Sequence, residues 1–439
     1  MHALHVIQGY SPWVGGSQRF FQEISERLVA AGHRVTVATT DAGELEHFWA
    51  RGRRTVEPAR EVVNGVEVVR FPVRRRLSRA LFFSIYRRLM AELSDLPVDM
   101  SPLLRRLARF TPRLPEFGAY LAESKTPFDL VHGANITLDF MLAPALAFAR
   151  RRGFPLIVTP FTHLGAPGQR RVQRYYTMRH QMEILRQADA VITQTSLESD
   201  LLAGRGVARE RLFRTGAGIN PAEVTGGDGR RFRERHGLEG PIVFSVGTLA
   251  YDKGTVHTIA AMRRLWAEGR RAHLVLAGQA VTPMQAYIRR LPEALKANLH
   301  VLGFVSEEEK RDLLAAGDLL CMPSCTDSFG IVYLEAWANE VAVIGARAGG
   351  VPAVVDDGGD GFLVRFGDVD GLARAIARLL DDPELARGLG RRGREQVERE
   401  MTWEHVYQRV YRVYEKVTAT GVESGGLGRR GHAQEHADG

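Results

Sequence analysis

The chain has 439 residues, more than one hydrophobic core usually supports, so its length favours two domains of roughly 200 residues each. With 45% hydrophobic and 25% charged residues, it has the composition of a globular protein, which excludes fibrous, collagen-like and wholly disordered chains. The net charge of +8 favours anionic partners, namely nucleic acid, an acidic membrane surface or phosphorylated small molecules.

The cysteine content and the N-terminal sequence narrow the cellular setting. Cys321 and Cys325 are too few for a disulfide scaffold or for a four-ligand zinc site. The first residues, MHALHVIQGYSPW, lack a basic segment followed by a long apolar one, and no later stretch approaches the length of a membrane span. We therefore expect a cytoplasmic protein, whose membrane contact, if any, is peripheral and on the inner face.

Short apolar segments alternate with longer amphipathic ones from the start of the chain, a pattern that builds parallel sheets covered by helices on both faces. The first series predicts strands at residues 4–9, 34–40, 66–73, 128–134, 155–161 and 190–195. We expect these strands to form a doubly wound, Rossmann-like domain over residues 1–218.

The segment 216–237 is rich in glycine and polar residues, and we interpret it as an interdomain linker in which Gly218 and Asn220 serve as a hinge. A second series then predicts strands at residues 241–248, 273–278, 299–304, 319–324, 341–347 and 361–364. This series defines a second Rossmann-like domain over residues 219–400. Two α/β domains of this kind would face a central cleft, where a nucleotide-type ligand is expected at the carboxyl ends of the strands.

The C-terminal region divides into a helix and a tail. Apolar residues recur at helical spacing in TWEHVYQRVYRVYEKV, at Trp403, Val406, Val410, Val413 and Tyr414. We predict a helix over residues 401–417 that packs back on the first domain, and a disordered tail over 418–439.

The second domain carries the strongest chemical signal. The predicted strand LLCMPS is followed by CTDSFGIVYLEAWANE, in which a helix begins near Phe329, Gly330 and Ile331. Free backbone N–H groups at a helix N-terminus suit a diphosphate, while Glu335, about one turn further on, suits ribose hydroxyls and Asp327 the sugar. The alternative is structural: Asp327 and Ser328 would merely cap the helix. A second loop with paired glycines, Gly349 and Gly350, favours the phosphate site.

The stretch PSCTDSFGIVYLEAWANEVAVIGARAGGVPAVVDDGGDGFLV resembles the donor-site signature of the retaining glycosyltransferases of family four, which have the GT-B fold. That signature has two glutamates separated by seven residues; here the first position is Asp327 and the second Glu335. VFSVGTLAYDKGT is similar to the segment whose Arg and Lys clamp the donor diphosphate. Lys253 matches the lysine, whereas Thr248 stands where arginine is usual. The resemblance also implies base recognition near GFVSEEEK, with contacts from Val305 and Lys310.

In the first domain, IQGYSPWVGGSQRFFQEISERLVAAGHRVTVAT is similar to the family's opening strand, glycine loop and helix. The resemblance places Gly15 and Gly16 close to the donor phosphate and the acceptor. It matches His163 to a histidine that faces the transferred sugar, although a structural histidine is the alternative. His132 we interpret as a packing or acceptor-side residue.

Residues 74–93 are both basic and apolar. Their sequence predicts an amphipathic helix with its apolar stripe in the core; an interfacial helix at a membrane, near a lipid-linked acceptor, is the alternative. Arginines are not interleaved with aromatic residues on a platform, so we do not expect a nucleic-acid partner.

The family resemblance implies net transfer of a sugar from a nucleoside-diphosphate sugar to a sugar, lipid-linked or small-molecule acceptor, with retention and without a metal or other cofactor. The setting would be polysaccharide, glycolipid or glycoconjugate biosynthesis of the bacterial type. Two alternatives remain open. One is a sugar-nucleotide epimerase of the same shape, and the other is a catalytically weak sugar-nucleotide-binding protein, as Thr248 and Asp327 would allow.

Overall fold

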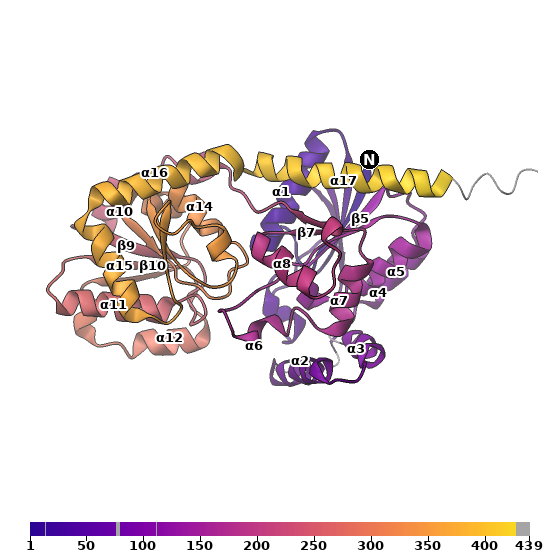
Figure 1. Ribbon diagram of the computed structural model, residues 1–439, viewed down its shortest axis with the longest axis horizontal. Coiled ribbons are helices and arrows are strands. Elements are labelled where there is room, and N and C mark those ends of the chain that lie inside the picture. The colour runs from indigo at the N-terminus through magenta and orange to yellow at the C-terminus, as the bar shows by residue number, and fades with distance from the viewer. Residues whose placement is uncertain (14, 76–79, 111, 427–439) are drawn as a thin grey trace, which may run out of the picture.

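The chain folds into two α/β halves, each built on one sheet and lying side by side (Figure 1). The computed structural model describes residues 1–13, 15–75, 80–110 and 112–426. The first half contains the strands β1 (His2–Val6), β2 (Arg34–Thr40), β3 (Arg60–Val63), β4 (Val66–Phe71), β5 (Leu130–Ala134), β6 (Leu156–Thr159), β7 (Ala190–Thr193) and β8 (Leu212–Arg214). The second contains β9 (Ile242–Val246), β10 (His273–Ala277), β11 (Leu299–Gly303), β12 (Leu319–Cys321), β13 (Ala342–Ala346) and β14 (Gly361–Val364).

Helices connect almost every pair of strands. The α-helices of the first half are α1 (Gly16–Ala30), α2 (Ala80–Asp95), α3 (Ser101–Ala108), α4 (Pro115–Glu123), α5 (Leu142–Arg152), α6 (Arg170–Gln173), α7 (Arg179–Gln187) and α8 (Ser196–Gly204). Those that follow are α9 (Pro221–Val224), α10 (Gly229–His236), α11 (Thr255–Ala267), α12 (Thr282–Arg289), α13 (Glu307–Ala316), α14 (Ile331–Ala338), α15 (Val369–Asp381), α16 (Pro383–Glu400) and α17 (Trp403–Gly426). Short 3₁₀ helices are η1 (Leu45–Phe48), η2 (Ile136–Leu138), η3 (Arg209–Arg211), η4 (Glu293–Leu295) and η5 (Val351–Ala353).

The strand order confirms two doubly wound sheets. The first sheet runs β3-β4-β2-β1-β5-β6-β7-β8, and the second runs β11-β10-β9-β12-β13-β14. All neighbours are parallel except β3, which is antiparallel to β4. The order reverses between β1 and β5 in one sheet and between β9 and β12 in the other, and ligands bind beside such reversals in open α/β sheets.

The predicted strands all form, within a few residues at each end, because each is a short run of Val, Ile, Leu and Ala buried under helices. The short edge strands β3 and β8 were not predicted. Every residue of β5 and β13 is buried, as expected for strands covered on both faces. Local caps mark the helix starts: the hydroxyl oxygens of Thr195 and Ser306 accept hydrogen bonds from the N–H groups three residues later.

The interpretation of residues 216–237 as a linker is wrong for most of the segment, which forms α9 and α10. Helix α10 packs on α13, where the buried Asp312 receives hydrogen bonds from the backbone N–H of Asp228 (2.7 Å) and the guanidinium of Arg231 (2.6 Å). Glycine and polar residues there serve as caps and turns. Only residues around 216–220 cross between the halves.

The two halves are joined by two adjacent chain crossings. The N–H of Ile219 donates to the carbonyl of Met401 (3.1 Å), and the N–H of Trp403 donates to the carbonyl of Ile219 (3.0 Å). A Cβ on Gly218 would lie 2.6 Å from the carbonyl carbon of Thr402, so this position requires glycine. Figure 1 shows α16 on the second half continuing into α17, which lies along the first half.

Helix α17 packs against α1, with Trp403, Val406, Val410, Val413 and Tyr414 in the shared core, as their helical spacing predicts. The helix runs to Gly426, past residue 417, so the prediction of a disordered tail is wrong for residues 418–426; residues 427–439 lie outside the described chain. Helix α17 therefore belongs to the body of the first half, although it follows the second half in sequence.

A fully buried hydrogen-bonded chain fixes α17 to the first sheet. The Tyr414 hydroxyl lies 2.6 Å from Nδ1 of His132 and 3.0 Å from Nε2 of His5; Nδ1 of His5 lies 2.8 Å from the Ser25 hydroxyl. Ser25 donates to the carbonyl of Phe21 (2.6 Å), which can only accept. This fixes the other protons in turn. Because the Ser25 hydroxyl donates to Phe21, it accepts from Nδ1–H of His5; Nε2 of His5 then accepts from the Tyr414 hydroxyl, whose oxygen accepts from Nδ1–H of His132.

Burial lowers the pKa of His5 to about 3 and the pKa of His132 well below its usual value. Both rings are therefore neutral. The hydrogen-bonded chain requires this, because a second proton on the Nε2 of His5 would point at the Tyr414 hydroxyl, which already donates its own proton to that nitrogen. His132 is thus a packing residue, one of the two roles that its sequence position suggested.

We expect Tyr414→Phe to lower the free energy of unfolding by about 2 kcal/mol or more, because it leaves two buried polar nitrogens without partners, each at a cost of about 1–3 kcal/mol. Urea unfolding measures the loss. The matched control is Tyr407→Phe on the same helix: Tyr407 is 7% exposed, and among the described residues its hydroxyl has no hydrogen-bond partner. Equal losses in the two variants would contradict the role given to the buried chain.

Candidate functional site

The loops after β9 and β12 meet where the order of the second sheet reverses. Lys253, in the first loop, forms an ion pair through its ammonium with Oδ1 of Asp327, in the second; the two side chains are 23% and 13% exposed. The other carboxylate oxygen of Asp327, Oδ2, is buried and has no partner among the described residues. A partly dehydrated acceptor without a donor marks a place where a ligand hydroxyl would fit.

Asp252 holds these two loops together. Its carboxylate accepts a hydrogen bond from the Thr326 hydroxyl (2.7 Å), and its backbone carbonyl accepts one from the N–H of Cys325 (2.8 Å). Sequence reasoning missed Asp252, although it directly precedes Lys253. The positions of Lys253 and Asp327 are therefore set by backbone contacts and not only by their own ion pair.

Helix α14 begins beside this pair. Gly330 has φ +92°, and a Cβ there would lie 2.4 Å from the Tyr333 ring, so the sharp entry into the helix requires glycine. Within the described chain, the backbone N–H groups of Phe329, Gly330 and Ile331 make no hydrogen bond. Three free N–H groups at the positive end of a helix dipole form an anion site. The structure thus brings the predicted residues 327–331 together with Lys253.

Glu335 lies on α14, 15% exposed, with Oε1 at 3.3 Å from the Lys310 ammonium. Burial raises the pKa of the Glu335 carboxyl, while Lys310 and, from the first half, Arg19 oppose the rise. Lys310 also pairs with Glu307 at 2.8 Å. Lys310 was predicted to contact the base, but here it partners Glu335. Arg19, which sequence reasoning missed, is a cation on α1 close enough to act on Glu335.

His163, after β6, faces the Lys253–Asp327 pair from the first half. Its ring stacks on Tyr176 (centroids 4.8 Å apart, planes at 18°), and burial, with the charge of Lys253 adding to it, lowers its pKa to about 4. Neither ring nitrogen has a hydrogen-bond partner in the described chain. His163 is therefore a neutral imidazole whose donor and acceptor are both open to a ligand.

Glu198 fixes the strand ends behind His163. Its carboxylate, 1% exposed, accepts hydrogen bonds from the N–H groups of Thr162 (2.6 Å) and Gln194 (2.7 Å), which follow β6 and β7. Burial raises the pKa of Glu198 to about 7. A local signal for Glu198 exists: TSLE has the spacing of a capping box, and the Thr195 hydroxyl does accept a hydrogen bond from the N–H of Glu198.

The prediction that Gly349 and Gly350 help to form a phosphate site needs correction. The N–H of Gly349 donates to the carbonyl of Gly165 (2.9 Å) and that of Gly350 to the carbonyl of Asp327 (2.8 Å), so neither is free for a phosphate. Their role is close packing between loops. Gly15 is the N-cap of α1, where a Cβ would lie 2.4 Å from Oε1 of Gln18, and Gly16 begins the helix; their approach to the donor phosphate stays a prediction.

Two further predicted donor residues, Thr248 and Val305, make no hydrogen bond or ion pair with Lys253 or Asp327 in the described chain. Thr248 is exposed in the β9 loop, and Val305 is half-buried against the core; their donor contacts stay predictions. Phe329 is buried and packs against Gly216 at the chain crossing. Among the described residues there is no group of three or more His, Cys, Asp or Glu side chains placed to hold a metal ion.

Two family models match the chain, one for each half. The model described as "Glycosyl transferases group 1" matches residues 228–396, and "Glycosyl transferase 4-like domain" matches residues 15–218. The residues of the candidate site from Lys253 to Gly350 lie in the first match, and His163 lies in the second. Between them the two matches take in every strand of both sheets except β1.

Curated relatives agree with these matches. Over 425 residues, the chain is 27% identical to the MMP alpha-(1->4)-mannosyltransferase of Mycolicibacterium hassiacum, covering 92% of this chain and 95% of that protein. It is 34% identical to the alpha-maltose-1-phosphate synthase of Mycolicibacterium smegmatis over 194 residues, 42% of this chain and 49% of that protein. The chain thus aligns with about half the length of the second relative.

Solved structures share the fold over nearly the whole chain. Sucrose-phosphate synthase from Thermosynechococcus elongatus superposes with a TM-score of 0.69 at 22% identity, covering 95% of this chain and 99% of that one. The Anabaena protein HepE in complex with UDP and glucose superposes with a TM-score of 0.69 at 17% identity, covering 94% and 99%. At these identities the likeness concerns the fold.

We expect Gly350→Ala to lower the free energy of unfolding by about 1–3 kcal/mol, because its Cβ would lie 1.9 Å from the Ser328 carbonyl oxygen and both backbones would have to move. Urea unfolding measures the change. Gly118→Ala in α4 is the control: nothing lies within 4 Å of its Cβ, so replacing a helical glycine there should stabilise by about 0.5–1 kcal/mol. A neutral Gly350→Ala would contradict the close loop packing.

Proposed function

Because the chain belongs to the group 1 glycosyltransferases, the retaining family four, we propose that it moves a sugar from a nucleoside-diphosphate sugar to an acceptor hydroxyl. Membership confirms the resemblance that the sequence indicated, and the solved structures confirm the two-domain GT-B fold. We propose that the chain works in polysaccharide, glycolipid or glycoconjugate biosynthesis, with its donor domain over residues 219–400 and its acceptor domain over residues 1–218.

The observation that carries the proposal is the anion site at the start of α14. Three free N–H groups, Lys253 and the positive end of a helix dipole converge where the order of the second sheet reverses. A diphosphate is the ligand whose charge and number of oxygens match this set of donors. A nucleotide sugar bound there would direct its sugar toward Asp327 and His163.

The reaction requires stabilisation of the departing diphosphate. The bond from the anomeric carbon to the phosphate oxygen breaks, and the acceptor oxygen forms its bond on the same face, which gives retention. The departing oxygen gains negative charge, and it is also the base nearest to the attacking hydroxyl, so it receives the proton. Lys253 and the N–H groups of residues 329–331 stabilise that charge, and these groups need no divalent cation.

Three side chains orient the donor in this proposal. Oδ2 of Asp327 accepts from a sugar hydroxyl, the neutral His163 donates to or accepts from the outer edge of the sugar, and Glu335 accepts from the ribose. Thr248 cannot supply the second cation that arginine gives in the family. Arg19 is the candidate replacement, because its charge reaches Glu335 from α1; to bind the diphosphate it would exchange its ion pairs with Glu23 and Glu223.

The alternatives make different demands on the same site. A sugar-nucleotide epimerase would need an acid and a base on the sugar, and the shorter Asp327 together with Thr248 would suit a protein that binds a sugar nucleotide without turnover. Both share the anion site at α14. The transferase, the epimerase and the binding protein are distinguished by what each makes from the donor.

We expect release of nucleoside diphosphate that depends on an acceptor, measured with UDP, GDP and ADP sugars and a set of sugar and lipid-linked acceptors, with EDTA present throughout. Lys253→Ala should lower kcat/KM at least about tenfold, because a charge-assisted contact is worth about 1.5–3 kcal/mol. Asp327→Glu, which restores the residue usual in the family, should retain transfer.

Lys296→Ala is the matched control, since Lys296 is 53% exposed and, in the described chain, its ion pair is with its neighbour Glu293 and not with a residue of the site. Epimerised donor without release would favour the epimerase. Donor binding without either product would favour the binding protein.

We also propose peripheral membrane contact through α2. Among the described residues, no helix combines the length and the apolarity that crossing a membrane needs. Helix α2 nevertheless exposes Phe82 (48%), Ile85 (55%) and Leu89 (49%) along one face, and Figure 1 shows α2 at the edge of the first half. An exposed apolar stripe beside basic residues suits an anionic bilayer surface.

The arginines of this region are not all available for lipid. Arg87 is buried near Asp139, the guanidinium of Arg75 donates to the carbonyl of His47, and Arg76 lies outside the described residues. The apolar face is therefore the better target for a test.

Replacing Phe82, Ile85 and Leu89 together by Ser should at least halve the fraction of protein that sediments with vesicles of phosphatidylglycerol and phosphatidylcholine, because the apolar surface that enters the bilayer is lost. Val62→Ser with Val281→Ser removes exposed apolar side chains elsewhere (70% and 40% exposed) and should leave sedimentation unchanged. Equal sedimentation of wild type and triple variant would refute contact through α2.

A further inference from the structure

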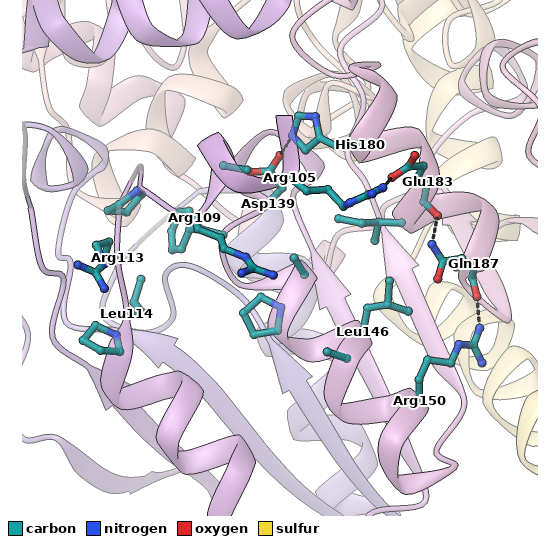
Figure 2. Close-up of a pocket in the computed structure, with 18 residues that line it drawn as sticks. Arg105, Arg109, Arg113, Leu114, Asp139, Leu146, Arg150, His180, Glu183 and Gln187 are labelled. Atoms are coloured by element: carbon teal, nitrogen blue, oxygen red, sulfur yellow. Dashed lines mark hydrogen bonds and ion pairs between the residues drawn. The ribbon is translucent and has the colours of Figure 1, made fainter. Parts of the chain in front are cut away.

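A cavity of about 670 Å³ opens in the first half, away from the donor site (Figure 2). It is enclosed by α3, α5, α7 and the segment that leads into α4. Its volume lies within the roughly 300–1,000 Å³ typical of small-molecule sites. It includes none of the residues assigned to the donor, so it requires an explanation of its own.

The wall of this cavity is mostly apolar. Side chains from three helices and two connecting segments contribute to it: Ala108, Pro112, Leu114, Phe140, Ala143, Pro144, Leu146, Ala147 and Ile184. Ala143 and Ala147, one turn apart on α5, are exposed where larger residues would fill the space. A concave apolar surface of this size that stays open fits an aliphatic chain, which gains about 0.8 kcal/mol for each buried CH₂ group.

The charged residues around the cavity are unequally paired. Both acids that line it already have partners. Glu183 forms an ion pair with Arg105, and a carboxylate oxygen of Asp139 lies 2.6 Å from Nε2 of His180. Arg109 and Arg113 also line the cavity, and in the described part of the chain their guanidinium groups have no ion pair or hydrogen bond. Figure 2 shows Arg109 extending over the cavity from the α3 side.

We propose that this cavity binds an amphipathic anion, an aliphatic chain that carries a phosphate, with the chain on the apolar wall and the phosphate at Arg109 and Arg113. Arginine forms bidentate hydrogen bonds to phosphate, and a phosphate monoester has the charge to engage two guanidinium groups. The surrounding acids are already neutralised, so they do not repel it. A purely apolar ligand would leave the two cations unused.

The position of the cavity relates it to the rest of the molecule. Asp139 and Phe140 follow η2, which follows β5, so one end of the cavity lies at the carboxyl edge of the first sheet, where its strand order reverses. The same edge carries the loops that face the donor half. An aliphatic phosphate held here is anchored on the acceptor side of the protein. The inference does not depend on sugar transfer, because binding can be measured without a donor.

The test uses n-dodecyl phosphate below its micelle concentration, titrated into the full-length protein by isothermal titration calorimetry. We expect saturable binding of one molecule per chain, at least tenfold tighter than inorganic phosphate and than dodecyltrimethylammonium, which has the same chain and the opposite charge. Binding of inorganic phosphate with equal affinity would overturn the chain-binding role, and equal binding of the cation would overturn the phosphate role.

Variants locate the ligand. Arg109→Glu and Arg113→Glu should each weaken dodecyl phosphate binding at least tenfold, and Ala147→Trp, which fills the cavity, should do the same. The controls are Arg106→Glu, an exposed arginine of α3 that does not line the cavity, and Ala147→Ser, which keeps the space open. Both should bind as wild type does.

Two further results would overturn the proposal. One is unchanged binding to Ala147→Trp, which would place the alkyl chain elsewhere. The other is dodecyl phosphate that associates only when presented in phosphatidylcholine vesicles, which would indicate a membrane surface and not a cavity. Failure of sugar transfer in the turnover assay would leave these titrations unaffected, so the two proposals fail separately.

Discussion

The reversal of strand order in each parallel sheet is the constraint on which the site depends. Parallel strands need helical crossovers, and where successive crossovers pass to opposite faces no helix covers the carboxyl edge of the sheet. In the second sheet this place lies between β9 and β12, and the loops after those two strands carry Lys253 and Asp327. The free N–H groups of α14 open onto the same edge. The chemistry of this protein is therefore placed by topology first and by individual side chains second.

A site shared by two halves also requires that they keep facing each other. Two adjacent chain crossings, at Gly218 and Thr402, meet that requirement through backbone hydrogen bonds. Helix α17 then returns to the first half, where the Tyr414 hydroxyl joins the neutral rings of His5 and His132 in one buried chain of donors. Because every donor in that chain has one acceptor, the attachment has a single arrangement. The hydrogen bond from the N–H of Gly349 to the carbonyl of Gly165 adds a direct contact between the two halves.

The strands and α17 could be predicted from sequence because their signals are local, namely apolar runs and helical spacing. The short edge strand β8 was missed because its three residues carry little periodicity. The helix α10 was missed because its sequence is rich in arginine and has too few apolar residues to show a helical period. The residues around Asp327 and Glu335 were found through a family signature. Their surroundings were not: the charge of Arg19, on α1, opposes the rise in the pKa of Glu335, and Glu198, on α8, accepts a hydrogen bond from the N–H of Thr162. Pairings of this kind exist only once the chain is folded.

The pairing of Lys253 with Asp327 has a consequence for donor binding. Lys253 and Asp327 already neutralise each other where both are partly buried, so a diphosphate must compete with Asp327 for the ammonium. The binding free energy that Lys253 contributes is therefore the difference between two ion pairs. The helix N–H groups face no such competitor. Under the proposed function, the helix start would anchor the donor, and Lys253 and Asp327 would act as a pair that a complete donor rearranges: the phosphate would take the lysine, and the sugar hydroxyl would take the freed carboxylate. A ligand with only one of these parts would leave the other partner unsatisfied, which favours a nucleotide sugar over a nucleotide alone.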